Sequence, residues 1–171
     1  SDMMKFAVNL GAPIAVRYPR GTAYAGLEEY RQPIELGEAE WIYKEKDIAL
    51  FALGSMVKTA EEVRIRLKEE GFANCSLVNA RFVKPIDEEA ILDAAEHHKL
   101  IVTLEDNVLI GGYSQKVMDF AYENKLDVKV LAITLPDAYV EHGNVELLKK
   151  EVGLDTETIV GKIRAAFAKE N

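Results

Sequence analysis

Residues 48–53 read IALFAL, and this run of six apolar residues decides the fold class, because it suits a strand that is buried on both faces of a sheet. Gly54 and Ser55 interrupt the run. The next apolar residues recur at helical spacing: Val57, Ala60, Val63 and Leu67. Gly71 then supplies a helix-ending signal. The stretch 48–71 therefore predicts a buried strand followed by a helix, the repeating unit of a parallel sheet.

The same alternation continues to the end of the 171-residue chain. Apolar runs predict further strands at residues 76–82, 100–104 and 128–133. Periodicity and capping residues predict helices that begin near residues 87 and 113, and two closing helices at 144–151 and 156–169. We therefore expect an α/β fold of three layers, in which helices cover both faces of a mainly parallel, five-stranded sheet.

Residues 39–45 supply the remaining strand of this sheet. Their apolar alternation is weak, and Lys46-Asp47 can turn the chain back toward the strand at 48–53. We expect these two segments to pair as a hairpin at the edge of the sheet. One edge strand of the sheet would then be antiparallel.

The first 37 residues follow a different pattern. Residues 3–10 have a helical apolar stripe, residues 13–18 suit a strand, and Pro-Arg-Gly at 19–21 suits a turn. One helix and one strand cannot cover both faces of that strand. We therefore expect residues 1–21 to be the tail end of a preceding domain, residues 22–37 an interdomain linker and residues 38–171 the main domain. The start at Ser1-Asp2, with no methionine ahead of it, fits either a truncated chain or the remnant of a tag.

Composition limits the classes of partner. The formal net charge is -8, and the acidic residues are spread along the chain, so the protein's field repels phosphate backbones and anionic membranes. We expect no nucleic-acid or membrane partner. The longest apolar run is far shorter than the ~20 residues of a membrane helix. Cys75 is the only cysteine, which excludes an internal disulfide and favours a reducing, cytoplasmic compartment.

Arg20 is the sharpest candidate for a binding residue. It follows the predicted strand at 13–18 within the sequence Tyr-Pro-Arg-Gly, and open α/β sheets bind their ligands beyond the carboxyl ends of strands. The forked guanidinium group suits a phosphate. The alternative is an arginine in a surface turn, and the spacing alone favours that alternative. Arg17 lies on the strand itself, and we interpret it as structural.

Two weaker candidates follow other predicted strands. Glu105-Asp106 ends the strand at 100–104, and Gly111-Gly112 precedes the next helix, so carboxylates and free backbone N–H groups could meet in a cleft. The favoured alternative is a strand end with ordinary helix caps, because adjacent carboxylates rarely face the same point. Gly54-Ser55 could similarly bind an anion at a helix N-terminus, and capping explains it equally well.

The histidines offer no metal site. His97 and His98 are neighbours near a helix C-terminus, where adjacent side chains diverge by ~100°. His142 has no cysteine or second histidine at metal-ligand spacing. No serine, histidine and acid form a recognisable nucleophile arrangement, and Gly-x-Ser-x-Gly is absent. We therefore expect no catalytic residue and no metal ligand in this chain.

Four sequence motifs, in this order, resemble a known family. They are AVRYPRG at 15–21, NARFVKPID at 79–87, TLEDN at 103–107, and LPD at 135–137 with GLD at 153–155. The chain resembles the C-terminal portion of the 1-deoxy-D-xylulose-5-phosphate synthase family over almost its full length. One departure is Gly111-Gly112-Tyr113-Ser114-Gln115, where the family usually has Gly-Gly-Phe-Gly-Ser, and it weakens any inference of a flexible backbone cradle there.

The resemblance implies a transketolase C-terminal-domain-like fold within a three-domain enzyme that binds thiamine diphosphate and Mg²⁺. The first two domains hold the cofactor, and this chain corresponds to the third, with residues 1–21 as the end of the pyrimidine-binding middle domain. The intact enzyme, a homodimer, would join pyruvate to glyceraldehyde 3-phosphate. The resemblance places the substrate phosphate on Arg20. The family's Gly-Asp-Gly motif and its activating glutamate do not occur in this chain, so the fragment alone is expected to be inactive and to bind no cofactor.

Two other classes of function remain open at this point. The chain could be a free-standing module that binds a small anion at the carboxyl edge of its sheet. It could also be the β chain of a related two-subunit thiamine diphosphate enzyme, whose partner chain supplies the diphosphate site.

Overall fold

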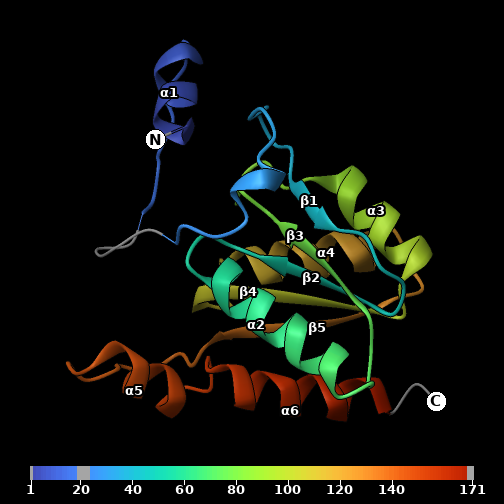
Figure 1. Cartoon of the computed structure of the whole chain (residues 1–171). Coiled ribbons are helices and arrows are strands. Elements are labelled where there is room, and N and C mark those ends of the chain that lie inside the picture. Colours follow the sequence, from blue (N-terminus) through green and yellow to red (C-terminus); the bar gives the residue numbers. More distant parts are fainter. Residues whose placement is uncertain (1, 19–23, 169–171) are drawn as a thin grey trace.

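A computed structural model of the chain describes residues 2–18 and 24–168. Five strands form one sheet in the order β1-β3-β2-β4-β5 (Figure 1). Their bounds are β1 Glu40–Tyr43, β2 Ile48–Ala52, β3 Cys75–Asn79, β4 Leu100–Val108 and β5 Lys129–Leu135. Strands β3, β2, β4 and β5 are parallel to one another, and the edge strand β1 is antiparallel to β3. The predicted mainly parallel sheet with one antiparallel edge strand is confirmed.

The predicted hairpin between residues 39–45 and 48–53 is wrong. Strand β1 pairs with β3, with Glu40 opposite Asn79, and not with β2. The reason is that β2 is buried along its whole length, and both of its edges are already taken by the parallel strands β3 and β4. Asp47 therefore does not serve as a hairpin turn. Its carboxylate accepts a hydrogen bond of 2.7 Å from the backbone N–H of Asn74, which precedes β3.

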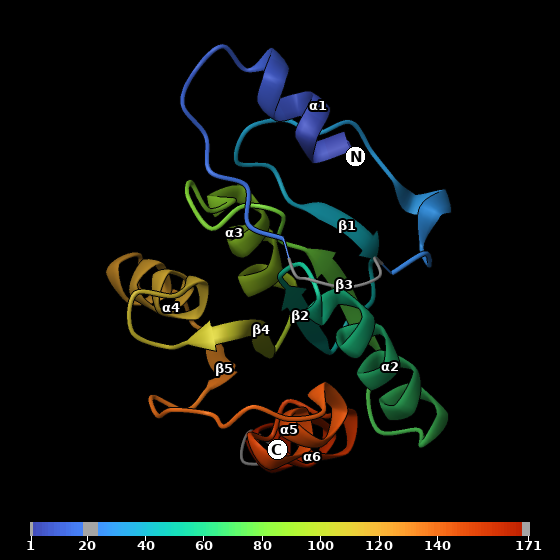
Figure 2. The ribbon, with the colours of Figure 1, turned by 90° about the vertical axis from the view of Figure 1, so that its left-hand side faces the viewer.

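Helices cover both faces of the sheet, as expected for three layers. Their bounds are α2 Met56–Glu69, α3 Glu88–His97, α4 Tyr113–Glu123, α5 Val145–Glu151 and α6 Thr156–Phe167. Figure 2 shows α3 and α4 on one side of the sheet and α2 and α6 on the other. Each face has its own core, because successive residues of β2 point to opposite sides: Leu50 packs in the α2 and α6 core and Phe51 in the α3 and α4 core.

The N-terminal segment lies apart from these layers. Helix α1 (Asp2–Asn9) forms where the apolar stripe predicts it, and none of its residues is buried. It stands away from the sheet in Figure 1 and contacts the main domain through the ring of Phe6, whose centroid is 5.8 Å from that of Phe82. The strand predicted at 13–18 is wrong: these residues pair with no strand in the described part of the chain. A strand needs a neighbour for its hydrogen bonds, and the sheet offers none at this position.

The described part of the connector before β1 contacts the main domain. It contains the 3₁₀ helix η1 (Glu28–Tyr30), and the Tyr30 ring meets the Tyr43 ring edge-on with centroids 4.9 Å apart. The guanidinium group of Arg64, on α2, lies 3.7 Å from the centroid of the Tyr43 ring. Across residues 2–18 and 24–168, every helix is too short or too polar to span a lipid bilayer.

Candidate functional site at the carboxyl edge of the sheet

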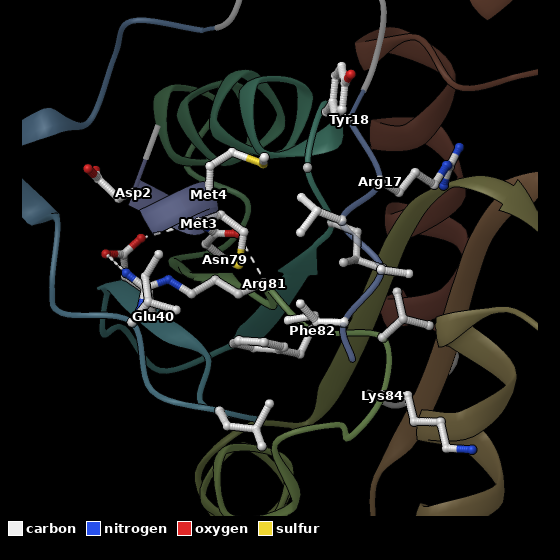
Figure 3. Close-up of a pocket in the computed structure, with 18 of the residues that line it drawn as sticks. Asp2, Met3, Met4, Arg17, Tyr18, Glu40, Asn79, Arg81, Phe82 and Lys84 are labelled. Atoms are coloured by element: carbon white, nitrogen blue, oxygen red, sulfur yellow. Dashed lines mark hydrogen bonds and ion pairs between the residues drawn. The ribbon is translucent and has the colours of Figure 1, made fainter. Parts of the chain in front are cut away.

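A groove of about 1320 Å³ lies at the carboxyl edge of the sheet (Figure 3). One wall is the N-terminal segment, α1 together with residues 12–18, and another is the connector at residues 31–36. The floor consists of residues that directly follow β2 and β3 and of Asp106 near the end of β4. This is the edge at which open parallel sheets bind ligands, because backbone groups and loop side chains of several strands converge there.

Asp106 joins three parts of the groove. Its carboxylate accepts a hydrogen bond of 2.9 Å from the hydroxyl of Ser55, at the start of α2. The guanidinium group of Arg17 lies 3.1 Å from the same carboxylate and also donates to the backbone carbonyl of Asp106 at 3.1 Å. Ser55 does not cap α2 with its own side chain, contrary to the capping alternative. The structural role expected for Arg17 agrees with this contact.

A second charged cluster fixes the connector to the sheet. Arg81 follows β3, and its guanidinium group pairs with the carboxylate of Glu40, on β1; both side chains are less than a tenth exposed. The same guanidinium donates to the backbone carbonyls of Gln32 at 3.0 Å and Pro33 at 3.1 Å. Glu40 also accepts from the Gln32 backbone N–H at 2.8 Å and from the Asn79 amide at 3.2 Å, as Figure 3 shows in part.

Sequence reasoning missed this cluster as a part of the groove. Arg81 was visible only inside the motif NARFVKPID, and nothing local connects it with Glu40, 41 residues earlier. One signal was available: Arg81 places a charge within the segment predicted as the strand at 76–82, and Glu40 places a carboxylate within the predicted edge strand at 39–45. The backbone of Arg81 has a φ of 54°, in the left-handed region that side chains other than glycine seldom adopt. The buried ion pair and its carbonyl partners hold that conformation.

Arg20 lies outside the described residues. Arg17 and Tyr18, which precede it, line the groove, and Tyr18 is largely exposed there. On the far side of the groove, the cationic group of Arg81 is already paired with Glu40.

Glu105 has a structural role, in agreement with the favoured alternative of a strand end with ordinary helix caps. Its buried carboxylate accepts hydrogen bonds from the backbone N–H groups of Tyr113 at 3.0 Å and Ser114 at 2.7 Å, and so caps α4. Gly112 makes this possible, since a Cβ atom there would lie 2.7 Å from the Glu105 carboxylate and 2.5 Å from the Val108 carbonyl. Gly112 therefore makes room for the chain's own carboxylate, while Asp106 faces the groove.

The side chains of His97 and His98 point to different surroundings, as expected for neighbours on a helix. His97 is exposed and its ring nitrogen bonds the Asp93 carbonyl at 2.8 Å, whereas His98 is buried between Trp41, on which it stacks, and Ser76 at 2.8 Å. Burial lowers the pKa of His98, so the ring is neutral near pH 7. The described residues contain no group of three His, Cys, Asp or Glu side chains able to hold a metal ion.

Cys75 is a free cysteine buried in the core, and its surroundings do not activate the thiol as a nucleophile. Desolvation raises the pKa of its thiol to about 12, which leaves almost no thiolate at neutral pH.

A protein-family model matches most of the chain. The model of the transketolase C-terminal domain matches residues 37–159, a range that begins just before β1 and ends within α6. The groove-forming residues that follow β2 and β3, together with Asp106, all fall inside this range.

Several curated relatives are 1-deoxy-D-xylulose-5-phosphate synthases. The chain is 45% identical to that of Lachnoclostridium phytofermentans over 162 residues, which cover 94% of this chain and 26% of the relative. It is 40% identical to that of Caldanaerobacter subterraneus subsp. tengcongensis, over 95% of this chain and 26% of the relative. For Aquifex aeolicus the identity is 35%, over 97% and 26%. The chain thus spans about a quarter of the length of these relatives.

Solved structures agree with the fold. A split-gene transketolase, described as an inactive β4 tetramer, matches with a TM-score of 0.74 and 26% identity over 80% of this chain and 44% of that chain. A transketolase from Pichia stipitis matches with a TM-score of 0.55 and 16% identity, over 77% and 18%. The second likeness concerns the fold alone.

Proposed function

Because this chain belongs to the transketolase C-terminal domain family, we propose that it is the C-terminal part of a 1-deoxy-D-xylulose-5-phosphate synthase. The intact enzyme would be a thiamine diphosphate-dependent transferase that converts pyruvate and glyceraldehyde 3-phosphate into 1-deoxyxylulose 5-phosphate and CO₂, for isoprenoid, thiamine and pyridoxal biosynthesis. The observation that carries this proposal is the 35–45% identity to such synthases over at least 94% of the chain.

We place thiamine diphosphate and Mg²⁺ on the preceding domains of the intact enzyme. The described residues of this chain do not fit the metal, since they contain no cluster of three potential ligands. The acidic and basic groups of the groove are also largely engaged with each other, as in the pairs Arg81–Glu40 and Arg17–Asp106. This part of the enzyme supports the assembly and closes one side of the active site.

By itself this chain is then inactive. The split-gene transketolase offers a precedent, since its separate β4 assembly is described as inactive. The test measures CO₂ release from pyruvate and glyceraldehyde 3-phosphate with thiamine diphosphate and Mg²⁺, first with the purified chain and then with the intact protein. Activity of the intact protein and none of the chain is the expected result. Turnover by the chain alone contradicts the proposal.

Arg20 is proposed as the anchor for the substrate phosphate. The resemblance assigns that role to the arginine of Tyr-Pro-Arg-Gly, and Arg17 and Tyr18 lead the chain along the groove toward it. In the intact enzyme, Arg20→Ala should remove about 1.5–3 kcal/mol of phosphate interaction, or on the order of 10- to 150-fold in kcat/KM for glyceraldehyde 3-phosphate.

Two matched variants sharpen that experiment. Arg66→Ala removes an exposed guanidinium group of α2 that pairs with Glu70, the residue after the helix, remote from the groove, and should leave kcat/KM unchanged. Arg17→Ala tests whether the neighbouring arginine holds the phosphate instead. Loss of aldehyde specificity in Arg17→Ala without loss in Arg20→Ala would contradict the assignment to Arg20.

We further propose that the intact enzyme is a cytoplasmic homodimer. Light scattering on the full-length protein measures its mass in solution, and a mass of one polypeptide contradicts the homodimer.

A second candidate, the β chain of a two-subunit enzyme, is favoured by the 26% identity to the split-gene transketolase. The mass of the native polypeptide decides between the synthase and the β chain, because the synthases are about four times longer than this chain.

A further inference from the structure

We propose that an apolar surface at the carboxyl edge of the sheet docks the main domain onto the preceding domain of the same polypeptide in the intact enzyme. This edge surface consists of Leu109 and Ile110, which follow β4, and of residues 136–147, which follow β5 and include the start of α5. The inference rests on the proposed function, because it takes the chain to be one part of a longer enzyme.

The edge surface exposes several large apolar side chains. Ile110 is 73% exposed. Every residue from 136 to 147 is exposed, and four of them are large and apolar: Tyr139, Val140, Val145 and Leu147. Single apolar residues on a surface are ordinary, whereas a contiguous group of them marks a site of contact with another protein surface.

The two parts of the edge surface leave the sheet side by side. Val108 and Leu135 are paired at the ends of the neighbouring strands β4 and β5. These strands are parallel, so the residues that follow them emerge at the same edge. Leu109 and Ile110 therefore adjoin the segment that begins at residue 136, and together they form one surface.

Hydrogen bonds hold the backbone of the edge surface in place. The N–H of Gly112 donates to the Leu109 carbonyl at 3.0 Å and closes the turn that carries Ile110. The Asn144 side chain caps α5 by accepting from the N–H groups of Glu146 and Leu147 at 3.0 and 3.3 Å. An ordered backbone lowers the entropy that docking costs, because less conformational freedom remains to be lost.

Helix α5 also needs a further contact. It has seven residues and buries none of them. A helix of that length is unstable in water unless one of its faces packs against another element. The exposed side chains of Val145 and Leu147 offer such a face.

The path of the N-terminal segment favours the preceding domain as the partner. Residues 12–18 cross the same edge of the sheet, and the Arg17 guanidinium group lies 3.1 Å from the carboxylate of Asp106, two residues before Val108 on β4. Helix α1, which comes before them, is unburied. The chain spans 26% of the length of the related synthase, and the preceding domains would join it through α1, beside the edge surface.

The experiment introduces a cysteine at one of two exposed tyrosines in the intact enzyme, Tyr139→Cys or Tyr122→Cys. Tyr122 is the matched control: it is 86% exposed near the end of α4, which begins at the carboxyl edge and runs to the opposite edge of the sheet. A maleimide should label position 139 about tenfold more slowly than position 122, because docking buries a large apolar side chain at 139. In this chain alone the two rates should be similar.

Peptide mass spectrometry measures the labelling rate at each position. Equal rates at 139 and 122 in the intact enzyme overturn the inference. An active synthase with a freely labelled position 139 counts against the edge surface alone. A protected position 139 in a protein without synthase activity counts against the proposed function alone, so the two failures are distinguishable.

A cross-linking experiment identifies what covers the surface. Benzoylphenylalanine in place of Ile110 should, on irradiation, form a cross-link within one polypeptide, to a peptide that precedes this chain. Asp137 and Glu141 add negative charge to the edge surface, so that peptide should combine apolar residues with lysine or arginine. A cross-linked product with twice the mass of the polypeptide would show that a second copy covers the surface, and would overturn the inference.

Discussion

The N-terminal segment and the central strand β2 are both apolar in sequence, yet they differ in what surrounds them. In β2 all five residues are fully buried, because β3 and β4 flank the strand and helices cover both of its faces. In α1 none is buried, and Val8 is 80% exposed. The difference teaches that apolar periodicity specifies local structure, while burial requires a partner element. The main domain provides that partner for β2 and leaves α1 largely without one.

The largest expected difference between the two regions appears when one phenylalanine in each is replaced by alanine. Phe51→Ala, in β2, should lower the free energy of unfolding by about 3–5 kcal/mol, because it opens a cavity between the sheet and its α3 and α4 layer. Phe6→Ala, in α1, should cost less than about 1.5 kcal/mol, since its ring is half-buried and packs edge-on against Phe82. Urea unfolding of the chain measures both. Similar losses in the two variants would contradict the comparison.

A smaller effect is expected from the buried ion pair that fixes the connector. Glu40→Gln should cost about 3 kcal/mol, because it leaves the Arg81 guanidinium group buried without its counter-charge. Glu28→Gln is the matched variant; its pair with Arg31 is more than half exposed on both sides and should contribute less than about 1 kcal/mol. Unfolding curves at low and high salt provide the measurement. Equal costs for the two variants would show that the Glu40 carboxylate is not buried in solution.

Acid should lower the stability of the main domain through His98. Burial lowers the pKa of His98 below its ordinary value of about 6.5, so the unfolded chain binds a proton more readily than the folded one. The stabilisation that the neutral ring contributes is complete above about pH 6.5. It is lost as the pH falls from there to the lowered pKa, because the unfolded chain gains its proton first.

The test compares the free energy of unfolding at pH 7.5 and pH 5.5, with proton NMR titration of the histidine rings. His98→Phe keeps an aromatic ring against Trp41 and should show a smaller difference between the two pH values. Asp93 and His97 also face this site and contribute charge, so His97→Gln serves as the control. A His98 ring that titrates at or above pH 6.5 contradicts the prediction.

The smallest effect in the chain itself is expected at Val8. Val8→Ser should change the free energy of unfolding by less than about 0.5 kcal/mol, because its side chain is already exposed. In the intact protein the same substitution should cost more than about 1 kcal/mol if the preceding domain covers α1. Thermal unfolding of both forms measures the contrast. An equally small effect in the intact protein would mean that α1 stays uncovered there.

Much of the fold was predictable from sequence, and the errors have one origin. The strands, the helices and the mainly parallel order follow from periodicity, from caps such as Asp87 and from glycines at helix ends. Both errors concern strand pairing: β1 joins β3 instead of β2, and residues 13–18 find no partner. Pairing depends on which edges the remaining strands leave open, and a local pattern carries no record of that.

The groove was predictable only in outline. The sequence indicated that Arg20, Ser55 and Asp106 each follow a strand-like stretch, and it offered them as separate candidates. It could not indicate that Ser55 donates to Asp106, 51 residues away, or that Glu40 and Arg81 neutralise each other. The first contact forms because the parallel strands β2 and β4 end at the same edge of the sheet, and the second because the antiparallel strand β1 begins at the edge where β3 ends.

The sequence by itself determined the α/β class, the family resemblance and the places of helices and strands, because these depend on the identity and spacing of neighbouring residues. Only the tertiary structure decided which charges are paired, which carboxylate caps a helix and which apolar surfaces stay exposed. The physical reason is that hydrogen bonds and burial are made between residues distant along the chain. Their energies depend on distances and desolvation that exist only after the sheet has formed.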